Sequence, residues 1–254
     1  MAALKANRNS RAVVRIFLLF VFAAMIRYIW TAFTAFPYAM NLAKTLGDKF
    51  DKTVLGQMMS TDPKFYLITS LYNILIAILV LSFWRRLDHH KLSDMGLNWT
   101  SRRWKELLLG GVLAAVIIGI SVSTTLTLGF MWSVTKGTVA FGASEVMRTM
   151  AYAIFICGIT VFGEEVLYRG YIQTSASTFV HPTTAVYISA LIFMMSRFGV
   201  FDNALGILEI FLLGLILGYL YLLTGSLYIT IGFRFVWDFL KIYTFRFQDE
   251  IGFK

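Results

Sequence analysis

The chain has 254 residues, of which 58% are hydrophobic and 15% are charged, whereas a typical soluble domain carries about 25% charged residues. This composition excludes a disordered or low-complexity protein. The single cysteine, Cys157, excludes an internal disulfide and a multi-cysteine zinc site. We therefore predict an all-α polytopic membrane protein.

Apolar stretches of about 20 residues, long enough to cross a bilayer as helices, recur along the whole chain. We expect about seven transmembrane helices, at residues 16–36, 65–84, 107–131, 150–168, 183–198, 205–223 and 227–245. We divide the chain into N-terminal transmembrane helices with a cytoplasmic loop (residues 1–149), a helical core (150–245) and a short tail (246–254).

Basic residues flank the first two predicted spans. Lys5, Arg8, Arg11 and Arg15 precede the first span, and residues 85–105 hold six Lys and Arg. Because such residues stay in the cytoplasm, we expect a multi-pass protein of the cell membrane with its N-terminus inside and its C-terminus outside. No small-residue cleavage site follows the first span, so we expect it to remain as an anchor. These loops and their attraction to anionic lipids explain the net charge of +9, and we expect no nucleic-acid partner.

Ionisable residues at membrane depth are concentrated in the predicted core. An ionisable group inside a span costs about 2.5–3.5 kcal/mol on insertion scales, so each one marks a candidate site. The set in the core comprises Glu164, Glu165, Arg169, Arg197, Glu209, Arg234 and Asp238. Glu165 and Arg169 are four residues apart, as are Arg234 and Asp238, and this spacing places both members of a pair on one helix face. We therefore expect two ion pairs, with Glu164 left available by the first.

Three motifs in this region resemble those of a known family. Residues 162–170, FGEEVLYRG, resemble the EExxxR motif of the CPBP family, which comprises CAAX-processing proteases and bacteriocin-processing enzymes and is also called Abi. Phe193 followed by Arg197 resembles the second motif, a Phe followed four residues later by a His. Residues 214–228 resemble the run into the third motif, a His with an Asn four residues later, which falls here on Arg234 and Asp238.

This resemblance covers about residues 150–240 and implies an intramembrane endopeptidase. It implies that Glu164 would activate a water molecule and that Arg169 would hold Glu165 in place. The histidines and asparagine of the family would position the water and stabilise the oxyanion or, in another interpretation, bind a metal. The sequence resembles the bacterial branch of the family and has no eukaryotic targeting signal, so we expect a bacterial plasma membrane.

The sequence departs from the family at the residues that matter most for chemistry. Both motif histidines are arginine, at Arg197 and Arg234, and the asparagine is Asp238. Arginine stays protonated, so it neither accepts a proton nor binds a metal, and we expect no metal or other cofactor. We expect a salt-bridge cluster instead, in which Arg234 pairs with Asp238, and Arg197 pairs with Glu209 or Glu164. Such a cluster would weaken Glu164 as a base.

These departures leave two functions open. The first is a proteolytically weak or silent family member that acts as a membrane scaffold or holds a partner protein, for example a cell-envelope enzyme. The second is an active peptidase for a CAAX-like or other peptide, with Glu164 activating water and Arg234 stabilising the oxyanion. A transporter is disfavoured because no inverted repeat is visible. His181 is a weak candidate for a surrogate catalyst, and Arg27 receives no role.

Overall fold

The computed structural model describes residues 2–46, 62–128, 143–197 and 204–249, and every regular element within these ranges is helical. The predicted all-α class is thereby confirmed. In chain order the elements are α1 (Ala2–Leu46), α3 (Pro63–Ser70), α4 (Tyr72–Arg86), η2 (Leu92–Met95), α5 (Ser101–Thr127), α6 (Ala143–Glu165), η3 (Val166–Gln173), α7 (Thr174–Ala176), α8 (Pro182–Met195), α9 (Ala204–Thr224) and α10 (Leu227–Asp249).

Within the described residues, which leave out 129–131 and 198, the seven predicted spans fall on helical segments. Five helical stretches there are long and apolar enough to cross a membrane. The five are Ala12–Thr45, Lys64–Arg86, Ser101–Thr124, Met150–Ala176 and Ala204–Thr224. The helix α8 is apolar but has 14 residues. The helix α10 carries Arg234, Asp238 and Lys241 along its length and is not among the five. Two of the six residues of the candidate site, Arg234 and Asp238, therefore lie on a helix that is less suited to a bilayer than the five.

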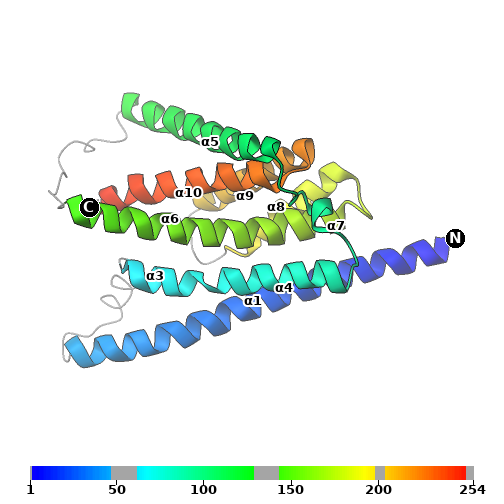
Figure 1. Cartoon of the computed structure of the whole chain (residues 1–254), viewed down its shortest axis with the longest axis horizontal. Coiled ribbons are helices and arrows are strands. Elements are labelled where there is room, and N and C mark those ends of the chain that lie inside the picture. The colour runs from blue at the N-terminus through cyan, green and yellow to red at the C-terminus, as the bar shows by residue number, and fades with distance from the viewer. Residues whose placement is uncertain (1, 47–61, 129–142, 198–203, 250–254) are drawn as a thin grey trace.

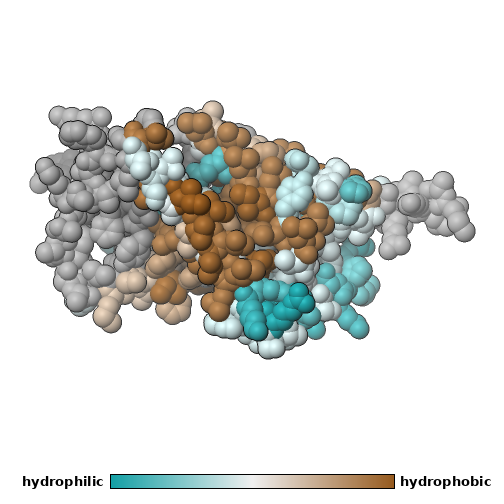
Figure 2. Space-filling model, turned by 90° about the horizontal axis from the view of Figure 1, so that it is seen from above, coloured by the Kyte–Doolittle hydropathy of each residue, from teal (hydrophilic) through white to brown (hydrophobic). Residues whose placement is uncertain are grey.

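The long helices lie roughly parallel in a bundle, with α1 along one side and α5 along the other (Figure 1). The helices α6 and α10 run between them, and α1 extends past its neighbours at its N-terminal end. A hydrophobic band crosses the middle of the face in Figure 2, and hydrophilic atoms gather mostly toward one end. This distribution is the one expected of a protein that spans a bilayer.

The two basic stretches lie at the same end of the bundle. Arg15 in α1 forms an ion pair with Asp88, which follows the C-terminal end of α4. This contact brings the start of the first span beside the loop that carries the six basic residues. The two stretches therefore lie on one side of the membrane, as the charge pattern predicts, although the identity of that side stays a prediction.

The core is centred on η3, where α6 changes from an α-helix to a π-helix. All eight residues of η3 are buried. Tyr171 packs edge-on against Trp84 of α4, and Tyr168 packs edge-on against Phe193 of α8, with ring centroids 5.8 and 5.1 Å apart. Wide turns of this kind occur often at functional sites. The turn places the first motif in contact with three neighbouring helices.

Glycines allow the core helices to approach closely. A Cβ atom on Gly214 would lie 3.1 Å from Ala190 of α8, and one on Gly218 would lie 2.7 Å from Val186. This pair of small residues in α9 therefore lets α9 pack closely against α8. The contact between α5 and α10 is tighter, since a Cβ on Gly110 would lie 2.0 Å from the carbonyl oxygen of Ile229. The α10 backbone is thus fixed at the level of Arg234.

Candidate active site

The six predicted site residues lie together in one cluster. Glu164 and Glu165 end α6, Arg169 lies in η3, Arg197 follows the C-terminal end of α8, and Arg234 with Asp238 occupies the middle of α10. The helix α8 ends at Met195, so Arg197 lies one residue past the helix cap Ser196. The fold therefore assembles residues that lie up to 74 positions apart in the sequence.

The first predicted pair, Glu165 with Arg169, is present and completely buried. Arg169 Nη1 donates to Glu165 Oε1 at 2.7 Å, and both side chains have no exposed surface. Arg169 Nη2 also approaches the carbonyl oxygen of Gly214 in α9, at 3.4 Å. A buried charge is tolerated only when paired and hydrogen-bonded. This pair therefore fixes η3 against α9 and leaves Glu165 committed to a structural contact.

Glu164 is held by two arginines, one from each of the divergent motifs. Arg197 Nη2 donates to Glu164 Oε1 at 2.6 Å and to Oε2 at 2.5 Å. Arg234 Nη2 donates to Glu164 Oε2 at 3.0 Å. The Glu164 side chain is 9% exposed and that of Arg234 is 2% exposed. Both carboxylate oxygens are consequently occupied by charge-assisted hydrogen bonds, which are among the strongest in proteins.

Arg234 also connects the second predicted pair to the acidic pair. Its Nε donates to Asp238 Oδ2 at 2.8 Å, and its Nη1 lies 3.9 Å from Glu165 Oε1. Among the described residues, Arg234 Nη1 has no hydrogen-bond partner. Arg234 is therefore the hub of the network, since it is the one cation shared by Asp238 and both glutamates.

The aromatic ring of Phe193 lies against three of the guanidinium groups. The Cζ atoms of Arg169, Arg234 and Arg197 are 4.8, 4.9 and 5.5 Å from the ring centroid. A guanidinium near an aromatic face gains about 0.5–2 kcal/mol, more when the pair is desolvated. Phe193 therefore provides a surface that three close cations share. Three carboxylates and three guanidiniums make the cluster formally neutral.

The network decides between two pairings that the sequence leaves open for Arg197. Its partner is Glu164, whereas Glu209 forms an ion pair with Lys241 of α10. The Glu209 side chain is 41% exposed and is paired outside the cluster. Glu209 is therefore excluded from the site as the partner of Arg197. Arg197 itself turns inward rather than toward lipid headgroups.

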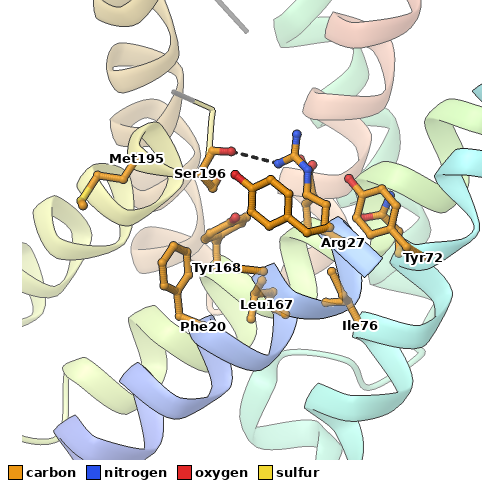
Figure 3. Close-up of a pocket in the computed structure, with 13 residues that line it drawn as sticks. Phe20, Arg27, Tyr72, Ile76, Leu167, Tyr168, Met195 and Ser196 are labelled. Atoms are coloured by element: carbon orange, nitrogen blue, oxygen red, sulfur yellow. Dashed lines mark hydrogen bonds between the residues drawn. The ribbon is translucent and has the colours of Figure 1, made fainter. Parts of the chain in front are cut away.

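Arg27 of α1 is the neighbour of the site that sequence reasoning missed. Its Nη1 donates to the carbonyl oxygen of Ser196 at 2.9 Å, and its guanidinium lies 6.0 Å from the centroid of Tyr72 (Figure 3). Arg27 and Glu164 line the same pocket. The feature of the sequence that could have pointed to Arg27 is that it is the one charged residue inside the first predicted span.

Two other residues considered from the sequence lie outside the cluster. His181 caps the N-terminal end of α8, where its Nδ1 contacts the Thr183 hydroxyl on the exposed surface. Cys157 is buried in α6. The candidate role of His181 as a surrogate catalyst receives no geometric support.

The donor set at the site does not fit a metal ion. No group of three His, Cys, Asp or Glu side chains gathers anywhere in the described ranges. Glu164 is surrounded by the guanidiniums of Arg197 and Arg234, which have no lone pair to donate and repel a cation. The chemistry of the site is therefore that of its carboxylates and guanidiniums.

The comparison with protein families identifies the C-terminal part of the chain. Residues 146–240 match the family model described as type II CAAX prenyl endopeptidase Rce1-like. Among curated proteins, no match to the chain was found. The matched range contains the whole cluster and agrees with the extent of the three motifs, which confirms the resemblance predicted from them. Residues 146–240 are thus similar to an Rce1-like domain of the CAAX protease family, in a chain that has five helices long and apolar enough to cross a membrane.

Proposed function

We propose that this protein does not cleave peptides efficiently and acts in the membrane as a scaffold that binds a partner protein, such as an enzyme of the cell envelope. The observation that carries the proposal is the occupation of both Glu164 oxygens by Arg197 and Arg234. A general base needs a water molecule within about 2.6–3.2 Å and a free lone pair to receive its proton. The three charge-assisted hydrogen bonds from these two arginines compete with water for the Glu164 oxygens and with the proton for their lone pairs.

The neighbouring groups do not replace the missing base. Glu165 is paired with Arg169 without exposure to solvent. Asp238 is paired with Arg234, and each arginine remains protonated at physiological pH. All three carboxylates among these six residues are therefore paired with an arginine, and Glu165 Oε2, which has no hydrogen-bond partner among the described residues, is completely buried.

The second candidate function is slow peptide hydrolysis at the same site. The observation that favours it is the Nη1 group of Arg234, which has no hydrogen-bond partner among the described residues and lies beside the acidic pair. A fixed N–H donor of this kind can stabilise an oxyanion, a contribution of about 2.7–4 kcal/mol for a single donor in known enzymes. In this case Glu164 would have to exchange one arginine for a water molecule.

The experiment measures cleavage of a prenylated CAAX-type peptide by the purified full chain and by Glu164→Gln. The proposal expects equal, background-level product from both proteins. Cleavage by the full chain that Glu164→Gln abolishes would refute it and establish the second candidate. A triple variant, Arg197→His, Arg234→His and Asp238→Asn, restores the family pattern and is expected to gain cleavage that Glu164→Gln removes again.

The scaffold role is tested separately from catalysis. The full chain and Glu164→Gln are each purified from native membranes under mild detergent. The proposal expects both to recover the same stoichiometric membrane or envelope protein, because binding does not require the base. Recovery that depends on Glu164, or the absence of any stoichiometric protein, would contradict it.

A further inference from the structure

A pocket of about 290 Å³ lies beside the cluster, between α1, α4, η3 and α8. In Figure 3, Arg27, Tyr72 and Ser196 lie toward one end of the pocket, and Phe20, Leu167 and Ile76 lie toward the other. Its lining is therefore divided into a polar end and an apolar end. Pockets that combine an apolar lining with a few directed polar groups are the usual form of small-molecule sites.

Arg27 brings a positive charge to this pocket and forms no salt bridge with a carboxylate of the described ranges, although Glu164 also lines the pocket. Arg27 contacts the Ser196 carbonyl oxygen and the Tyr72 ring, which are neutral. The adjacent cluster of six charged residues is balanced internally, since both oxygens of Glu164 are held by Arg197 and Arg234. The pocket thus has a surplus of one positive charge, and a ligand with one negative charge would balance it.

The position of Arg27 along α1 restricts the kind of anion. Arg15 is paired with Asp88 at the basic end of the bundle, which marks the level of the membrane surface. Arg27 is twelve residues further along the helix, or about 18 Å at the α-helical rise. The hydrocarbon layer is about 30 Å thick, so Arg27 lies near its middle. Lipid headgroup phosphates stay at the surface, out of its reach.

The pocket opens toward the hydrocarbon. Tyr28 and Met195 belong to its lining and are 75% and 56% exposed. The adjoining surface of α1 exposes further apolar side chains, among them Phe17, Phe22 and Ile29. A ligand can therefore enter from the bilayer and leave its tail among the lipids, because the pocket needs to hold only the polar head and the first part of the chain.

We propose that this pocket binds a fatty acid from the membrane, with its carboxylate paired to Arg27 and its chain extending past Tyr28 and Met195 into the bilayer. The carboxylate supplies the missing negative charge. The chain meets the apolar part of the lining, and the Tyr72 hydroxyl is a second donor beside Arg27. The inference concerns a ligand site and goes beyond the proposed scaffold function, since it requires no peptide cleavage and no partner protein.

The test is equilibrium binding of radiolabelled oleate to the full chain in detergent micelles, with empty micelles as the background. Saturable binding is expected to weaken at least tenfold in Arg27→Met and less than threefold in Arg27→Lys, which keeps the charge. Arg85→Gln removes an exposed arginine at the end of α4 and is the matched control, with unchanged binding. Oleyl alcohol, which has the same chain without the carboxylate, should not displace the probe.

Equal binding by Arg27→Met and the full chain, or displacement by oleyl alcohol, would overturn the assignment. Saturable binding of a labelled hydrophobic peptide carboxylate, with no saturable binding of oleate, would also overturn it and point to a peptide. Should Arg27→Met fail to fold, Ala24→Phe fills the pocket without changing a charge. Loss of oleate binding in this second variant supports the proposal, and retained binding refutes it.

Discussion

Replacing Arg234 with histidine tests how much the network contributes to stability. Arg234 donates to Glu164 and Asp238 from different nitrogens and is 2% exposed. An imidazole is smaller than a guanidinium and is carried on a shorter side chain. Its two ring nitrogens therefore do not reach both carboxylates as the guanidinium does. Removing one member of a buried ion pair typically costs about 3–5 kcal/mol, because the partner remains buried without its counter-charge.

The effect should be visible as a large fall in melting temperature. For a chain of this size, 1 kcal/mol corresponds to about 2–4 °C, so Arg234→His should lower the Tm of the full chain in detergent by about 6–20 °C. Adding Asp238→Asn removes one of the unpaired acids and should recover part of the loss. The measurement is thermal unfolding followed by tryptophan fluorescence at one detergent concentration.

A pair with the same spacing, whose arginine is exposed, provides the control. Arg102 Nε lies 3.3 Å from Glu106 Oε1, and the Arg102 side chain is 86% exposed. Ion pairs on the surface contribute at most about 1 kcal/mol, so Arg102→His should barely change the Tm. Equal, small shifts for Arg102→His and Arg234→His would refute the reasoning that Arg234 is the hub of a buried network.

Three further substitutions, one of them with a control variant, test the site and its surroundings. Arg169→Met leaves Glu165 buried without its partner and should destabilise the chain by about 3–5 kcal/mol in the same melting assay. Gly110→Ala should lower the Tm, because its Cβ would lie 2.0 Å from a backbone oxygen and force α5 away from α10. Gly119→Ala is the control: its Cβ would meet nothing within 4 Å, so the Tm should stay unchanged or rise. Phe193→Leu removes the ring that three guanidiniums contact and should lower the free energy of unfolding by about 1–3 kcal/mol. A Tm equal to that of the wild type would show that these contacts do not stabilise the protein.

Features set by local spacing were predictable from the sequence. The pairs Glu165–Arg169 and Arg234–Asp238 follow from a separation of four residues on a helix, and the structure contains both. The helical segments follow from hydrophobic length. The motif spacing identified the family of residues 146–240. Each of these inferences depends on neighbours in the chain rather than on tertiary packing.

Features that depend on how helices face each other were not predictable. The spacing of charges could not choose between Glu164 and Glu209 as the partner of Arg197, because the choice depends on the rotation of α9 relative to α8 and α10. Nothing in the composition of residues 166–173 indicates a π-helix. Arg27 could be assigned a place beside the site only when α1 was packed against α8. These are properties of the assembled bundle.

The measurement that tests the central claim most directly is a double-mutant cycle between Glu164 and Arg197. The free energy of unfolding is measured for the full chain, Glu164→Gln, Arg197→Met and the double variant. Because Arg197 donates to both Glu164 oxygens, we expect a coupling energy of about 1–3 kcal/mol, in the range of residues that share a network. A coupling below about 0.5 kcal/mol, the level of independent sites, would show that Glu164 is not held by this arginine and would contradict the account.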